Sequence, residues 1–242
     1  MKRGQIALYV IITILIVAIG VSVFFISKQM TTEKHRQQII DNIRRSIEGC
    51  LDEKVQETTR TIALSGFYAN ITNPAISDAF FFVTQYYYDG KNIDVPAKQN
   101  VEQQLVIGLF ESNIHECFDF EKMVGMRVAT EECKEINISI DNSIKATFFC
   151  PIKLMMDDKE YLIEDFYAEA NLDVLKLLNY ARLVTQQYAK DKPLLCTTCY
   201  NAIIANKNLT LNILPLYTLG ENHTFFSLKD NTNNLMLIWA VK

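Results

Sequence analysis

Histidine is scarce in this sequence, and the common catalytic signatures are absent. The only histidines are His35, His115 and His223, and none has a second ligand at a spacing typical of metal sites. None is a recognisable base partner for a serine or cysteine nucleophile. The chain also lacks G-x-S-x-G, H-E-x-x-H, a P-loop and a glycine-rich dinucleotide turn. We therefore expect a protein that is not an enzyme and that needs no cofactor or metal.

Charged residues are missing from Ile6 to Ile26. A helix of that length rises roughly 30 Å, the thickness of the hydrocarbon core of a bilayer. A cleaved secretory signal is the alternative, but its apolar region is shorter. Cleavage after Ala18-Ile19-Gly20 would also leave an apolar end on the product. The pattern thus predicts a leader over 1–5 and an uncleaved transmembrane helix over 6–26.

Glycine and proline are also nearly absent between Lys28 and Ser65, where only Gly49 occurs. Apolar residues recur there at helical spacing. They are Ile39, Ile43, Ile47, Leu51, Val55 and Ile62. We expect the first helix to continue as a long amphipathic helix that stops at Gly66.

The charge balance argues against nucleic acid as a partner, because the net charge is only −4. Lysine and arginine flank the apolar run on both sides and do not orient it. An even number of cysteines and four N-x-S/T sequons favour an extracellular C-terminal body. The sequon asparagines are Asn70, Asn137, Asn208 and Asn222. We therefore expect a single-pass protein of the cell membrane, with a cytoplasmic N-terminus.

The rest of the chain predicts an α+β fold. A helical stripe follows Pro96, a hairpin turns at Asp141-Asn142 and leads into a three-stranded antiparallel meander, and strand-like runs end the chain. A further helix is expected over about 171–190, with Asn171 or Asp173 as its N-cap. The expected parts after the transmembrane helix are a mainly helical lobe over 27–120 and a β-rich lobe over 121–242. In the YYYDG segment we expect tyrosines in the core, ahead of a turn at Asp89-Gly90.

Six cysteines form three candidate disulfides. With a two-residue turn at Asp141-Asn142, Cys133 faces Cys150 at a non-hydrogen-bonded position of the hairpin. Cys50 and Cys117 lie on the apolar faces of the two helices expected to pack together, and are the natural second pair.

The remaining cysteines, Cys196 and Cys199, form a C-x-x-C motif. Such a motif can be a redox centre, half a zinc site or a small structural loop. Zinc would need two further ligands, and a thioredoxin-like site would need the first cysteine at a helix N-terminus after a strand. The sequence favours the structural loop.

The start Lys2-Arg3-Gly4-Gln5, followed at once by the apolar run, resembles the leaders of archaeal type IV pilin-like proteins. The resemblance implies cleavage between Gly4 and Gln5 by a membrane peptidase, and a helix that forms the core of a filament. Tyr9 stands where these pilins usually carry glutamate. The overall pattern is similar to uncharacterised single-pass surface proteins of small-genome archaea.

Together these features predict a non-catalytic, membrane-anchored cell-surface protein that acts in adhesion or assembly as a pilin-like component. Its expected partners are the lipid bilayer, further copies through the N-terminal helix, or other surface proteins. The alternatives are an extracellular thiol-disulfide oxidoreductase that uses the C-x-x-C motif, and an accessory structural subunit of a membrane complex.

Overall fold

The computed structural model describes residues 3–71, 74–77, 82–118, 127–156, 159–191, 196–218 and 221–242, with side chains described from residue 33 onward except at the borders of the gaps. The chain divides into two compact units, residues 1–46 and 47–242. The larger unit contains helices and two β-sheets and is α+β, as predicted. The lobe boundaries predicted at 26/27 and 120/121 stay predictions.

The first helix, α1 (Arg3–Leu64), is continuous, as the lack of glycine and proline predicts. Within the larger unit its predicted apolar positions are buried: Ile47, Leu51, Val55 and Ile62 are at most 5% exposed. The helix ends where predicted, because Gly66 adopts a φ of +76°. The amide of Phe67 donates to the carbonyl of Ile62 (2.8 Å) and that of Gly66 to Ala63 (3.1 Å), which is the Schellman pattern of helix termination.

The transmembrane prediction needs correction. Within the described part of the chain, no helix combines the length and the apolar character needed to cross a membrane. From Glu33 onward α1 is rich in lysine, arginine, aspartate and glutamate, and α3 (Val174–Asp191) also carries charges, which are costly in hydrocarbon. The side chains of the predicted span, 6–26, lie outside the described residues. The transmembrane helix, the single-pass topology and the placement of the two ends across a cell membrane are therefore not supported.

The second helix is shorter than its apolar stripe predicts. Helix α2 (Lys98–Glu111) stops before Asn113, which has a φ of +53°, and the chain continues as the 3-10 helix η1 (Ile114–Phe118). Val101, Leu105 and Leu109 are fully buried, whereas Phe110 is 48% exposed. The predicted stripe, which also included Phe110, therefore identifies most of the buried face but neither the exposure of Phe110 nor the break.

The smaller sheet contains the predicted antiparallel meander. β4 (Glu135–Ile140), β5 (Ile144–Met156) and β6 (Lys159–Ala170) pair in sequence order, and β3 (Arg127–Thr130) pairs with the far end of β5. The predicted register is wrong by one residue, because Ile140 pairs with Ile144 across a three-residue loop. In this loop the Asp141 amide donates to the Ser143 carbonyl (2.9 Å), which the assumption of a two-residue turn overlooked.

The larger sheet has the strand order β1-β2-β9-β8-β7. Its strands are β1 (Pro74–Ser77), β2 (Phe82–Tyr88), β7 (Leu209–Thr218), β8 (Glu221–Asp230) and β9 (Met236–Val241). The predicted C-terminal strands are confirmed. The pairing of β2 with β9 is parallel and could not be predicted, because it joins strands from the two ends of the larger unit. Residues Leu237 to Val241 are all buried, so β9 is covered on both faces.

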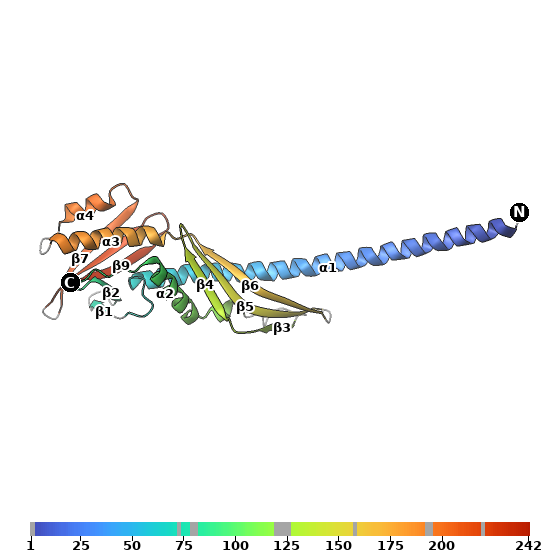
Figure 1. The fold of residues 1–242 in the computed structure, drawn as a ribbon, viewed down its shortest axis with the longest axis horizontal. Helices are drawn as coiled ribbons and strands as arrows, with labels where there is room; N and C mark the ends of the chain where they lie inside the picture. The colour runs from blue at the N-terminus through green and yellow to red at the C-terminus, as the bar shows by residue number, and fades with distance from the viewer. Residues whose placement is uncertain are drawn as a thin grey trace. The chain divides into compact units, whose positions relative to one another are not determined.

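Helices α3 and α4 (Thr197–Ile204) pack together beside this sheet (Figure 1). The Lys176 amide donates to the Asp173 carboxylate (3.0 Å), which confirms Asp173 as the N-terminal cap of α3. The Lys176 ammonium also lies 3.0 Å from the buried Asp230 at the end of β8. Burial raises the pKa of Asp230, but hydrogen bonds from Thr232 and Lys176 outweigh burial and hold this pKa below its ordinary value.

The tyrosines of β2 belong largely to the core, as expected. Tyr87 is fully buried, stacks on Trp239 and donates its hydroxyl hydrogen to the Gly66 carbonyl (2.9 Å). The predicted Asp89-Gly90 turn follows, in which the amides of Lys91 and Asn92 donate to the Asp89 carboxylate. These hydrogen bonds, with that from Asn92 the strongest influence, lower the pKa of Asp89.

Candidate functional site

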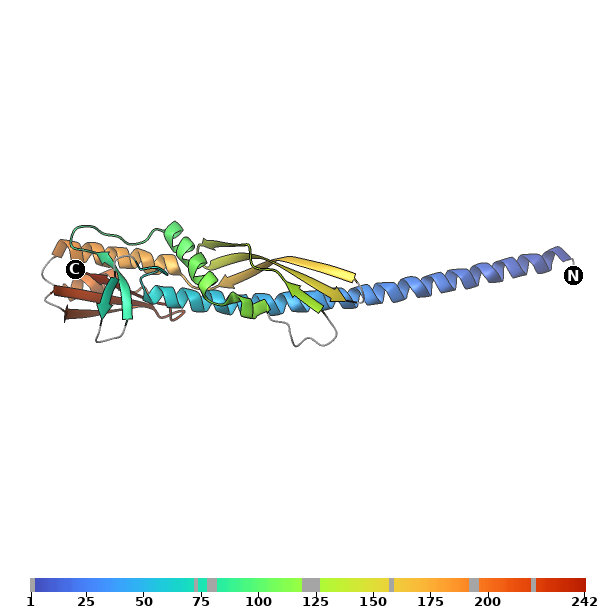
Figure 2. The same ribbon diagram turned by 90° about the horizontal axis from the view of Figure 1, so that it is seen from below.

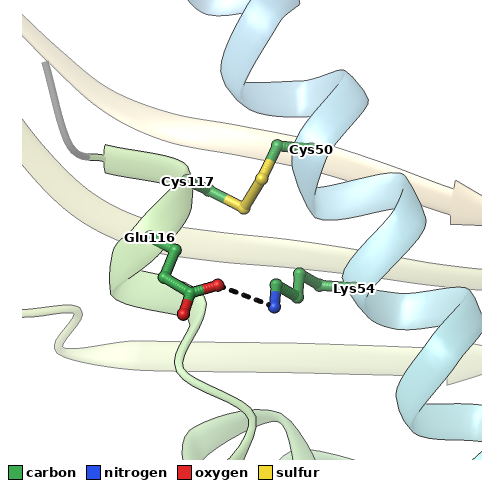
Figure 3. Close-up of a disulfide and its surroundings, with 4 residues drawn as sticks. All are labelled: Cys50, Lys54, Glu116 and Cys117. Atoms are coloured by element: carbon green, nitrogen blue, oxygen red, sulfur yellow. Dashed lines mark hydrogen bonds and ion pairs between the residues drawn. A yellow bond between two sulfur atoms is a disulfide. The ribbon is translucent and has the colours of Figure 1, made fainter.

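The long helix is joined covalently to the body. Cys50 of α1 and Cys117 of η1 form a disulfide whose Cα atoms are 5.6 Å apart, and the Lys54 ammonium lies 3.0 Å from the Glu116 carboxylate one helical turn further on (Figure 3). The pair is the one expected from the two apolar helix faces. Because the bond is covalent, it prevents α1 from shifting along its axis relative to η1.

The same segment of α1 also protects the edge of the smaller sheet. Among the strands that the structure describes, β6 pairs with β5 alone, so alternate amides along its outer edge point away from the sheet. Two of them have partners on α1: the Tyr167 amide donates to Glu48 (3.2 Å) and the Glu169 amide to Asp52 (2.7 Å). Both views show strands of this sheet alongside the part of α1 that belongs to the larger unit (Figure 2).

The geometry explains why this contact works. Residues four apart on a helix are separated by about 6 Å along its axis, and residues two apart on a strand by nearly 7 Å. A pair of carboxylates at positions i and i+4 of α1 therefore matches alternate amides of β6. A helix carboxylate also pairs with an amide at the opposite edge of the sheet, because the Ile140 amide of β4 donates to Glu102 of α2 (3.0 Å).

The second disulfide joins the segment before β4 to β5 in the smaller sheet. Cys133 and Cys150 are bonded with a Cα separation of 4.0 Å, as expected, although the register that suggested the pair is wrong. Cys133 lies just before β4, where the Lys134 amide donates to the Phe149 carbonyl (2.9 Å). Because the chain before β4 departs from the regular strand pairing, Cys133 reaches Cys150 although the β4–β5 register differs by one residue from the predicted one.

The C-x-x-C motif lies at a helix N-terminus, whereas the sequence favoured a structural loop. Cys196 is the N-cap residue of α4, and its sulfur accepts a hydrogen bond from the Cys199 amide (3.2 Å). Cys196 and Cys199 are bonded to each other and both are half-buried. The signal that sequence reasoning missed is the helical spacing of Tyr200 and Ile204, which indicates a short helix after the motif.

An aromatic cluster holds α4 in place. Tyr200, next to Cys199, is fully buried, and its ring meets Phe226 of β8 edge-on at 5.6 Å. Phe226 in turn stacks on Trp239 of β9 (5.3 Å) and meets Tyr188 of α3 (6.0 Å). The helix that follows Cys196 is therefore packed against the sheet through Tyr200.

Other predicted site residues remain separate from these features. Asn70, Asn137 and Asn208 are exposed, whereas the side chains of Asn222 and Gln5 and the surroundings of Gly4 lie outside what the structure describes. The structure brings none of the three exposed asparagines to the disulfides, and the use of the sequons stays a prediction. In the described ranges, no group of three or more histidine, cysteine, aspartate or glutamate side chains could hold a metal ion.

Three disulfides are compatible with an extracellular or otherwise oxidising compartment. Comparisons with protein-family models, curated proteins and solved structures found no match to this chain.

Proposed function

We propose that this protein is a non-catalytic assembly component, pilin-like in plan, in which the N-terminal part of α1 packs against the same part of other copies. The observation that carries the proposal is the continuity of α1 from Arg3 to Leu64. One end of this helix is uncharged from Ile6 to Ile26, and the other end is linked to the body by the Cys50–Cys117 disulfide. A helix that is apolar on all sides needs to be buried, and further copies supply a partner of the same kind.

The linkage to the body supports the same role. In an assembly, force on the N-terminal part of α1 would pass to the body at the Cys50–Cys117 disulfide and the edge contacts of Glu48 and Asp52. Covalent attachment prevents α1 from being pulled away from η1. This arrangement suits a subunit that holds a folded body on a shared helical core.

The proposal is tested by placing a charge in the apolar run. Val17→Arg in the full chain should abolish assemblies seen by sedimentation and electron microscopy, because each buried arginine would lack a partner. Gln38→Arg is the matched control, since Gln38 is exposed on the same helix. Unchanged assembly of the Val17→Arg variant would refute the proposal.

The resemblance of the leader adds a processing step to this proposal. The mature chain should begin at Gln5, and intact mass with terminal peptide sequencing of the native protein measures this directly. A retained Met1 would remove the pilin-like part of the proposal and leave only the assembly by helix packing.

The position of Cys196 favours a second candidate function, thiol-disulfide exchange. A helix N-terminus stabilises a thiolate, and Cys196 is the N-cap of α4. The thiolate of a dithiol protein would attack a sulfur of the Cys196–Cys199 bond and form a mixed disulfide. Its second thiol would then displace the bound cysteine, so that two electrons and two protons pass to Cys196 and Cys199.

Selective reduction tests this candidate. In a glutathione buffer of graded potential, Cys196–Cys199 should open first, as mapped by alkylation and mass spectrometry. The other bridges each include a cysteine that is at most 7% exposed, Cys117 or Cys150, and should resist. Equal resistance of all three bridges would exclude the exchange activity.

A further inference from the structure

The larger sheet ends in a strand whose outer edge is open. β7 is the last strand in the order β1-β2-β9-β8-β7, and the structure describes no strand on its other side. The Asn231 amide donates to the Asn208 carbonyl (3.1 Å), and these two residues continue the register of β7 with β8. Because the direction of hydrogen bonding alternates along a strand, the even-numbered residues of β7 bond to β8 and the odd-numbered ones point outward.

The outward positions begin with three apolar residues. Leu209, Leu211 and Ile213 each direct an amide and a carbonyl away from β8. Within the described part of the chain, none of these three amides has a hydrogen-bond partner. Pro215 takes the next outward position, where its lack of an amide hydrogen costs no bond to β8. The open edge therefore runs over 209–213 and ends at a proline.

The edges of the smaller sheet, by contrast, are covered by helix carboxylates. Glu48 and Asp52 accept from amides of β6, and Glu102 accepts from an amide of β4. The segment that contains the open edge of β7, from Asn208 to Gly220, has no charged residue. Charged side chains on an edge strand oppose pairing with another strand, and this edge lacks them. We propose that the edge of β7 pairs antiparallel with the same edge of a second copy.

One register uses the whole open edge. With the two-fold axis at Leu211, the Leu211 residues of the two copies pair with each other, and Leu209 of each copy pairs with Ile213 of the other. All three outward amides of each copy are then hydrogen-bonded across the contact. Shifting the register by two residues would set Pro215 opposite Leu209, whose carbonyl would face a residue without an amide hydrogen.

Both faces of the strand match in this register, which favours a second copy as the partner. The outward residues lie on the face of the sheet that carries the buried Phe226, because Ile213 pairs with Phe226. Thr210 and Asn212 lie on the opposite face and are exposed, so solvent reaches the edge from that side. In the dimer, Thr210 of one copy faces Asn212 of the other, and the apolar outward residues face one another. Polar side chains therefore meet polar ones, and apolar side chains meet apolar ones.

Amide hydrogen exchange tests the contact directly. The contact is separate from the helix packing proposed above, so the test uses the full chain with Val17→Arg, and failure of the helix packing leaves its result unchanged. Exchange is resolved by residue with NMR. The amides of Leu209, Leu211 and Ile213 should exchange about fourfold more slowly at about ten times the dimer dissociation constant than at about one tenth of it, because only the dimer protects them.

Two other results of this measurement would overturn the proposal. Protection that is the same at both concentrations would mean that the edge is covered by something other than a second copy. Rapid exchange at both concentrations would mean that the edge stays open.

A proline substitution assigns the dimer to this edge. Leu211→Pro removes an outward amide from each copy, so the dimer dissociation constant measured by sedimentation should rise about thirtyfold, the ratio for two hydrogen bonds of about 1 kcal/mol each. Ile138→Pro is the matched control and should leave dimerisation unchanged. Ile138 is half-buried like Leu211, and its amide points outward from β4 as that of Ile140 does. Unchanged dimerisation of Leu211→Pro, or an equal effect of Ile138→Pro, would overturn the proposal.

Discussion

Removing the disulfides one at a time should reveal how strongly α1 is tied to the body. The bridges close loops of very different length, with sequence separations of 67 for Cys50–Cys117, 17 for Cys133–Cys150 and 3 for Cys196–Cys199. If a disulfide acts by restricting the unfolded chain, its contribution grows with the logarithm of the loop length. The chain-entropy relation gives about 4.4, 3.1 and 1.6 kcal/mol for the three bridges at 25 °C.

The assay is urea unfolding of three double cysteine-to-alanine variants, followed by circular dichroism. The Cys50/Cys117 variant should lose the most stability and the Cys196/Cys199 variant the least. Loss of packing also contributes, because Cys117 and Cys150 are buried. The slope of the unfolding free energy against urea separates the two effects, since only a freed loop exposes more chain in the unfolded state and raises that slope.

The order of the three losses is the sharp test of this reasoning. If the Cys196/Cys199 variant loses as much stability as the Cys50/Cys117 variant, the short bridge stabilises by packing and not by loop closure. If the slope is unchanged in the Cys50/Cys117 variant, then the unfolded chain does not expand when the bridge is removed, and the entropic account fails.

Three further predictions follow from particular contacts. Gly66→Ala should lower the unfolding free energy by about 1–2 kcal/mol, because Gly66 has a left-handed backbone conformation. Gly49→Ala should raise it by about 0.5–1 kcal/mol, because Gly49 lies inside α1 with open space around it. Thermal unfolding measures both changes, and equal effects would contradict the different roles of the two glycines. Asp230→Asn should destabilise the protein by roughly 1–3 kcal/mol at pH 7. Because the pKa of Asp230 is depressed in the folded protein, the stability difference between wild type and Asp230→Asn is fully present above the unfolded pKa of about 3.9. It should vanish as pH falls through the folded pKa. Urea unfolding at a series of pH values measures this, and a difference that persisted below the folded pKa would contradict the stabilising role of the Asp230 carboxylate. Asp52→Ala should speed hydrogen exchange at the Glu169 amide, which donates to Asp52, and unchanged exchange would show that the edge contact is not protective.

Local patterns predicted much of the fold. The meander, the C-terminal strands, the Asp173 cap and the stop at Gly66 all depend on neighbours in the sequence. Two local predictions failed, each because of a single residue. The second helix is shorter than predicted because Asn113 takes a positive φ, and the hairpin loop is longer than predicted because it includes Ser143. The disulfide partner of Cys133 was nevertheless found, because its segment lies outside the ladder and can shift.

Long-range features could not be predicted in this way. The parallel pairing of β2 with β9 and the match of Glu48 and Asp52 to the edge of β6 depend on chain segments far apart in the sequence. The C-x-x-C motif was recognised, but its position at a helix N-terminus was not, since α4 is only 8 residues long.

The central claim, that the N-terminal part of α1 packs against other copies, is tested most directly by crosslinking. A photoreactive residue in place of Ile12, in a mixture of isotope-labelled and unlabelled chains, distinguishes links between copies from links within one chain. The account predicts links from residue 12 to residues 6–26 of a second copy. Links confined to the same chain, or to proteins other than this one, would contradict it.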